Sequence, residues 1–173
     1  MKRLFKILTV VFLVIVSSAI FAQEAKMVIE KSQISEGVTL EHRYTPGEMG
    51  SFDSLIISKE GKPAVIFNSE GRKIKEVFPL DTNTDGKLEY LVSMDCGGSG
   101  GYYDIAIIKE KEDKWISIWE NTLPQPKINV QINDGKPCVQ IEYVQRMNES
   151  MVNSTLKLTF DNESVIKSES SKN

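Results

Sequence analysis

Four oxygen-bearing side chains stand in the middle of the chain at the spacing of a calcium-binding loop: Asp81, Asn83, Asp85 and Glu89. Oxygen ligands at positions one, three and five, with glycine at position six, suit Ca²⁺. An EF-hand would also need glutamate at position twelve, where this chain has Val92. Asp and Asn side chains equally stabilise ordinary turns by accepting hydrogen bonds from backbone N–H groups. Four side chains fall short of the six to eight oxygens that Ca²⁺ takes, so we expect mainly a polar turn with weak Ca²⁺ binding at most, and no other cofactor.

A second chemically distinctive segment runs from Cys96 to Tyr103 with the sequence CGGSGGYY. Its glycines leave the backbone free to adopt unusual dihedral angles and to approach a partner closely. Its two adjacent tyrosines offer amphipathic contact area. The segment therefore suits a protruding recognition loop made by Ser99, Gly100, Gly101, Tyr102 and Tyr103, and a plain flexible hairpin loop is the alternative.

The same glycines formally match the nucleophile-elbow pattern G-x-S-x-G around Ser99. That elbow lies between a strand and a helix, and an Asp and a His follow it in the chain. Here a strand-like segment follows, and the single histidine, His42, comes earlier. A phosphate-binding loop would need a Lys-Ser/Thr pair, which is missing. We expect no catalytic residues and no enzyme activity.

His42 and the tryptophans fit structural roles better than ligand-binding ones. His42 alternates with polar residues on the apolar face of a strand-like run, and no second histidine exists to complete a zinc site. Trp115 and Trp119 lie on one face of their run and are interpreted as packing residues.

Strands must position these segments, because the apolar residues recur with a period of two. The clearest alternating runs are residues 38–44, 88–92, 128–132, 139–143 and 156–160. Asp134-Gly135 joins two of these runs directly and predicts a tight hairpin. About ten candidate strands and no helical stripe predict an all-β fold, an antiparallel β-sandwich of about 8–10 strands. We place this domain at residues 37–161, after a lead-in at 23–36 and before a polar, frayed C-terminal tail at 162–173.

The N-terminus has the composition of a signal peptide. Three cations precede an apolar stretch at residues 7–16, and small residues follow up to Ala22. The stretch is too short to span a bilayer comfortably, which disfavours the alternative of an uncleaved anchor. We expect a signal peptide at 1–22 cleaved after Ala22, with Ala19 as second choice, and a periplasmic or secreted protein that does not contact the membrane after processing.

Processing also sets the charge and the redox environment. Loss of Lys2, Arg3 and Lys6 leaves 18 cationic against 24 acidic side chains, a net charge of −6. This charge opposes nucleic-acid binding. In an exported chain an even pair of cysteines usually forms a disulfide, so we expect one between Cys96 and Cys138, with two free thiols as the alternative.

Three segments together make the chain similar to the periplasmic inhibitors of invertebrate-type (i-type) lysozyme. They are Met49–Phe52 (MGSF), residues 81–92, and Gly98–Tyr102 (GSGGY), and the similarity spans residues 41–108. The last resembles the family's Ser-Gly-x-Tyr inhibitory loop.

The resemblance implies a β-sandwich, allows a homodimer, and assigns inhibition to Ser99 and Tyr102, which would enter the lysozyme cleft. Tyr103 is the alternative tyrosine if the spacing is one residue longer. We therefore expect a non-enzymatic inhibitor of an i-type lysozyme or another peptidoglycan hydrolase. The alternative is an exported structural or adhesive β-domain that binds calcium.

Overall fold

A computed structural model describes residues 26–172 except 49–50, 60 and 162–163. The described residues form twelve strands in three antiparallel sheets of four strands each, without any helix. In each sheet the strands are neighbours in the order of the chain. The predicted all-β antiparallel fold is confirmed, with more strands than expected and with three sheets in place of the two of a simple sandwich. None of the described residues belongs to a helix long and apolar enough to cross a membrane.

The strand bounds are as follows. The first sheet contains β1 (Val28–Ser35), β2 (Val38–Tyr44), β3 (Phe52–Lys59) and β4 (Lys62–Asn68). The second sheet contains β5 (Lys73–Leu80), β6 (Glu89–Asp95), β7 (Tyr102–Lys111) and β8 (Lys114–Pro124). The third sheet contains β9 (Lys127–Asn133), β10 (Lys136–Met147), β11 (Ser150–Asp161) and β12 (Ser164–Lys172).

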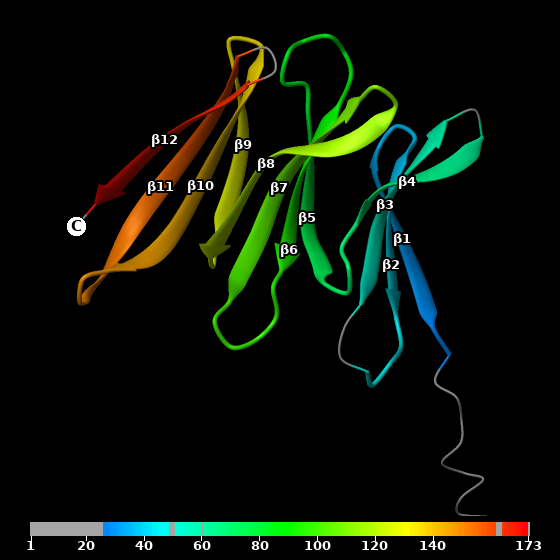
Figure 1. Cartoon of the computed structure of the whole chain (residues 1–173), viewed down its shortest axis with the longest axis horizontal. Helices are drawn as coiled ribbons and strands as arrows, with labels where there is room; N and C mark the ends of the chain where they lie inside the picture. The colour runs from blue at the N-terminus through cyan, green and yellow to red at the C-terminus, as the bar shows by residue number, and fades with distance from the viewer. Residues whose placement is uncertain (1–25, 49–50, 60, 162–163, 173) are drawn as a thin grey trace, which may run out of the picture.

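The three sheets stand side by side, with the second sheet in the middle (Figure 1). Two hydrophobic cores fill the two seams. The core between the second and third sheets includes the fully buried side chains of Leu91, Ile107 and Leu158. The core between the first and second sheets includes those of Val38, Leu55 and Val92. Burial of this apolar surface, worth roughly 25 cal/mol per Å², is the main force that stacks the sheets.

Strand β6 shows why the middle sheet differs from a sheet in a simple sandwich. Its first six residues are all buried. Leu91 packs in the core toward the third sheet, whereas Tyr90 and Val92 pack in the core toward the first. Successive side chains of a strand point to opposite faces, so a strand covered on both faces loses the apolar–polar alternation. The run at residues 88–92 therefore has no polar face of the kind that its alternation predicted, because Leu91 is as buried as Tyr90 and Val92.

Both predicted ends of the domain need correction. Strand β1 lies in the expected lead-in and pairs with β2 from Val28 opposite Tyr44 to Ser35 opposite Val38. Strand β12 lies in the expected frayed tail and pairs with β11 along nine residue pairs. Each of these strands completes a four-stranded sheet, and backbone pairing requires no apolar side chain of the added strand.

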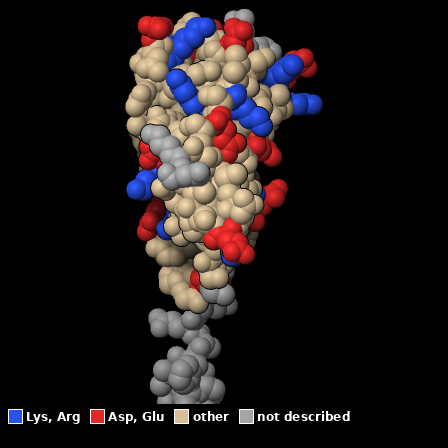
Figure 2. Space-filling model, turned by 90° about the vertical axis from the view of Figure 1, so that its left-hand side faces the viewer, with Lys and Arg blue, Asp and Glu red and all other residues tan. Residues whose placement is uncertain are grey.

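The third sheet closes the stack with a polar outer face. Asn129, Gln140, Thr155 and Lys157 alternate with the core residues of their strands. Viewed from this side, cationic and anionic side chains are interspersed over the molecule (Figure 2). Terminal units of stacked architectures need such a face for solubility.

The hairpin predicted at Asp134-Gly135 is confirmed. Asn133 pairs with Lys136, and the two residues between them have φ angles of 51° and 76°. Two consecutive positive φ angles are the signature of a type I′ turn, whose twist matches that of the flanking strands.

Candidate functional site

The glycine-rich segment forms the loop between β6 and β7, at the lower end of the middle sheet in Figure 1. Residues 96–100 are exposed to solvent. Gly97, Gly98 and Gly101 have φ angles of 74°, 81° and 60°, which L-residues rarely adopt. These three glycines are therefore required by the path of the loop.

Hydrogen bonds hold the loop in place at its base. The Cys96 N–H donates to the Tyr102 carbonyl over 3.0 Å, and the Gly97 N–H donates to the Asp95 carboxylate over 2.9 Å. The Gln125 N–H, just after β8, donates to the Gly101 carbonyl over 2.8 Å. The anchored loop thus presents its turn, where Ser99 lies, in a defined orientation.

Tyr102 lies directly against this turn. A Cβ atom built on Gly100 would lie 2.8 Å from Cδ2 of the Tyr102 ring. No side chain other than hydrogen therefore fits at position 100 unless the ring moves. The ring itself is 49% exposed. Tyr103 is half-buried and pairs with Asp95 on one side and Leu123 on the other.

A groove of about 800 Å³ runs beside the loop, between the second and third sheets. Gly100 and Tyr102 form one wall, and Tyr143, Val144 and Met151 contribute the facing side. Val144 and Met151 are exposed apolar side chains. Methionine adapts its shape to a partner, so the groove extends the loop into a continuous contact surface.

Tyr143 fixes the floor of the groove. Its side chain is buried, and its hydroxyl donates a short hydrogen bond to the Glu169 carboxylate on β12. Burial and this carboxylate together raise the pKa of Tyr143 to about 12. The phenol stays neutral at physiological pH and ties β10 to β12.

The acidic segment forms the loop between β5 and β6, at the opposite end of the middle sheet (Figure 1). The Asp85 carboxylate accepts hydrogen bonds from the Lys87 N–H over 2.8 Å and from the Asn83 amide over 2.9 Å. The backbone N–H of Lys87, followed by the amide of Asn83, lowers the pKa of Asp85. The turn therefore holds the Asp85 carboxylate in its charged form and in a fixed orientation.

Two further carboxylates support the same turn. Asp81 accepts a hydrogen bond from the Gly86 N–H over 3.2 Å, and Glu89 accepts one from the Thr82 N–H over 2.9 Å. These contacts are the turn capping that the sequence predicted. Within the described ranges, no three His, Cys, Asp or Glu residues are grouped to hold a metal ion. One oxygen, Oδ1 of Asp81, is buried without a hydrogen-bond partner.

The expected disulfide is absent: Cys96 and Cys138 are both free thiols. Cys96 is exposed at the base of the glycine loop, whereas Cys138 is buried near the start of β10. The β6–β7 loop and the start of β10 lie at opposite ends of the molecule (Figure 1), and a disulfide needs Cα atoms within about 7 Å. Partial desolvation, followed by a hydrogen bond to Asp104, raises the pKa of the Cys96 thiol.

The sequence analysis missed a buried carboxylate beside His42. Asp53 is 1% exposed, and its two oxygens lie 2.5 Å from Nδ1 of His42 and 2.7 Å from the backbone nitrogen of Ile74. Asp53 thus joins the first sheet to the second, and His42 is half-buried beside it. The signal was available, because Asp53 alternates with the apolar Leu55 and Ile57 on β3.

These features define an all-β protein of three stacked sheets that presents an exposed, glycine-built loop beside a groove. Comparison with known proteins adds no relative: no family model, no curated protein and no solved structure matches this chain.

Proposed function

We propose that this protein is an exported, non-enzymatic inhibitor of an i-type lysozyme and that the loop around Ser99 enters the enzyme's active-site cleft. One observation carries the proposal. The loop offers an exposed Ser99 and a Tyr102 ring packed on Gly100, in the order of the inhibitory loop that the sequence resembles.

The chemistry of the target suits such a loop. Lysozyme-type hydrolysis uses two carboxyl groups that flank an open sugar-binding cleft. The Ser99 hydroxyl can donate a hydrogen bond to such a carboxylate, and Tyr102 adds both ring area and a second hydroxyl. The loop contains no glycosidic bond, so it occupies the cleft without being cleaved. The charge of −6 on the processed chain favours association with a basic enzyme.

The groove beside the loop enlarges the proposed interface. Tyr102 borders both the loop and the groove, so an enzyme side chain from the rim of the cleft can pack between Tyr102 and Met151. A partly buried aromatic ring at the centre of an interface is the usual kind of hot spot, costing about 2 kcal/mol or more when removed. We therefore propose Tyr102, rather than the half-buried Tyr103, as the tyrosine that carries inhibition.

Residual lysozyme activity measured against Ser99→Ala and Tyr102→Ala tests the site. Each substitution should weaken inhibition of an i-type lysozyme by roughly thirtyfold, the equivalent of about 2 kcal/mol. Ser168→Ala on the exposed β12 strand and Tyr103→Phe serve as matched controls and should leave inhibition unchanged. If both loop variants inhibit like the wild type, the site is wrong.

A second candidate function, an exported structural or adhesive domain that binds Ca²⁺, is favoured by the buried, unpartnered oxygen of Asp81. A ligand that binds only the native state raises its stability. Thermal unfolding in excess Ca²⁺ and in chelator separates the two candidates. A rise in Tm that Asp81→Ala abolishes would support calcium binding, and identical curves would remove this candidate.

A further inference from the structure

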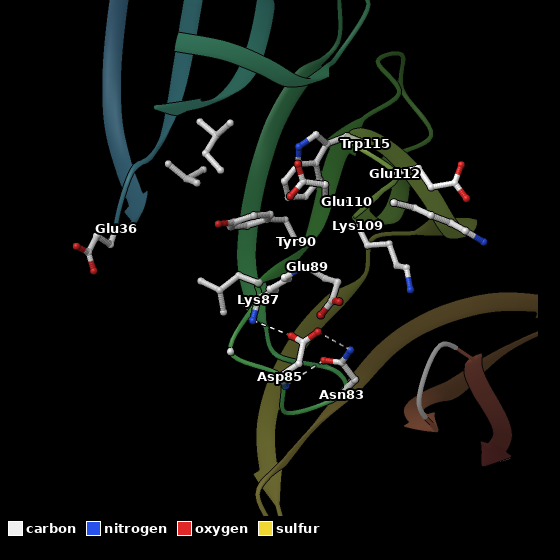
Figure 3. A pocket seen from close by; sticks show the side chains of 15 residues that line it. Glu36, Asn83, Asp85, Lys87, Glu89, Tyr90, Lys109, Glu110, Glu112 and Trp115 are labelled. Atoms are coloured by element: carbon white, nitrogen blue, oxygen red, sulfur yellow. Dashed lines mark hydrogen bonds between the residues drawn. The ribbon is translucent and has the colours of Figure 1, made fainter. Parts of the chain in front are cut away.

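A second cavity, of about 600 Å³, lies at the seam between the first and second sheets (Figure 3). The β5–β6 loop and the β7–β8 turn, which line it, are at the end of the molecule opposite the glycine loop (Figure 1). Four parts of the chain line it: the β1–β2 turn, the β2 and β3 residues Val38 and Ile57, the β5–β6 loop with the start of β6, and the end of β7 with the β7–β8 turn and the start of β8. Cavities of 300–1,000 Å³ are the size that small ligands occupy. The site shares none of its lining residues with the groove near Ser99.

An aromatic pair forms the apolar side of this cavity. The Trp115 and Tyr90 rings lie 5.8 Å apart with an interplanar angle of 44°. Tyr90 is buried, and its hydroxyl lies 2.9 Å from Oγ of Ser35, which fixes the ring from below. Trp115, which the sequence assigned to packing alone, is half-buried and lines the cavity. A supported, partly exposed indole is a platform on which the C–H face of a sugar ring can stack.

Acidic groups dominate the polar lining. Five carboxylates face three lysines around the cavity: Glu36, Asp85, Glu89, Glu110 and Glu112 against Lys87, Lys109 and Lys111. Figure 3 shows Asp85 and Glu89 below the aromatic pair and Glu112 to its side. Backbone N–H groups hold the carboxylates of Asp85 and Glu89, so the fold fixes the position of these negative charges.

Each feature of the cavity suits one property of a ligand. The apolar ring platform suits a C–H face, the excess of fixed carboxylates suits a positive charge, and the Asn83 amide suits hydroxyl groups. We propose that this cavity binds an amino sugar, with its pyranose ring on Trp115 and its ammonium group against the carboxylates around Asp85. The negative lining disfavours phosphates and other anions. An aromatic cage for a quaternary ammonium would need several open rings, and here Tyr90 is 2% exposed.

Fluorescence of Trp115 tests this site directly. The chain has two tryptophans, so a Trp119→Phe background leaves Trp115 as the only tryptophan, whose emission is excited selectively at wavelengths that tyrosine does not absorb. In chelator-containing buffer, titration with the trisaccharide of glucosamine should change its emission saturably. Asp85→Asn and Glu112→Gln, which keep the shape of each side chain, should each weaken binding about tenfold, the usual weight of one charge-assisted hydrogen bond. Ser99→Ala, at the other end of the molecule, should bind like the background protein.

Three outcomes would overturn the proposal. One is the absence of a saturable change with the glucosamine trisaccharide. Another is binding of the N-acetylglucosamine trisaccharide with the same affinity as the glucosamine trisaccharide. The N-acetylated sugar lacks the ammonium charges and should bind at least tenfold more weakly. The third is equal binding of spermidine, a cation without a sugar ring. Calorimetry on Trp115→Leu gives an independent readout: binding should be lost while circular dichroism shows an intact β-fold.

Discussion

Replacing Gly100 with alanine isolates the placement of the Tyr102 ring. Gly100 does not have a positive φ, so alanine can adopt its backbone conformation without strain. The new Cβ would lie 2.8 Å from Cδ2 and 3.0 Å from Cε2 of the ring. Ordinary carbon contacts are about 3.5–4.0 Å, so the ring must move by roughly half an ångström or more.

The two consequences of this shift differ in size. The ring is 49% exposed and can move into solvent, so the free energy of unfolding should fall by no more than about 0.5 kcal/mol. If the packed ring is a central contact worth about 2 kcal/mol, its displacement should weaken inhibition by ten- to thirtyfold. Gly100→Ala should therefore weaken lysozyme inhibition strongly while it lowers the free energy of unfolding only slightly.

Gly86→Ala is the matched control, because Gly86 has a φ of 80° and no heavy atom within 4 Å of its added Cβ. Backbone strain should destabilise it by about 1–2 kcal/mol, at the end of the molecule far from the loop. Denaturant unfolding and lysozyme inhibition should be measured on both variants. Gly100→Ala should lose inhibition and keep its stability, whereas Gly86→Ala should lose stability and keep its inhibition. Wild-type inhibition by Gly100→Ala would refute the role assigned to the Tyr102 ring.

The two cysteines, the buried Tyr143 and the N-terminus can each be tested separately. A thiol reagent should modify Cys96 in the native protein, and should also modify Cys138 after denaturation. If the denatured, non-reduced protein contained no free thiol, the two cysteines would be paired in a disulfide after all. The pKa of Tyr143 is raised to about 12, so its neutral form stabilises the fold by about 3 kcal/mol below pH 10, and this contribution is lost as the pH rises from 10 to 12. In denaturant titrations, the free energy of unfolding of a Tyr143→Phe variant should therefore fall less steeply over this pH range than that of the wild type. Identical pH profiles of the two proteins would count against the buried phenol. Intact mass of the exported protein should place its N-terminus at Gln23, and retention of Met1 would contradict cleavage.

The strands were predictable from the sequence where one face of the strand is buried and the other face is exposed to solvent. The alternation at residues 139–143 and 156–160 and the Asp134-Gly135 turn correctly predicted β10, β11 and the β9–β10 hairpin. Strand β12 escaped prediction because its Ser-, Lys- and Glu-rich sequence lacks an apolar face. Pairing with the adjacent β11 brings it into the sheet, and this backbone pairing leaves no mark in the side-chain pattern of the strand.

The candidate site was predictable only as a segment. The glycines marked the loop around Ser99, but Tyr143 and Met151 reach the groove from strands more than 40 residues away. The expected disulfide failed for a related reason: the compartment suggests that cysteines pair, but only the fold sets their separation. Asp53 shows the opposite case, since a charged residue among alternating apolar ones already indicates a buried, hydrogen-bonded carboxylate.

The most direct test is a bacterial-cell lysis assay in which the purified, processed wild-type protein is titrated against i-type, chicken-type and goose-type lysozymes, with circular dichroism to establish folding. The proposed function predicts saturable inhibition of the i-type enzyme. Full activity of all three enzymes in the presence of excess folded protein would contradict it.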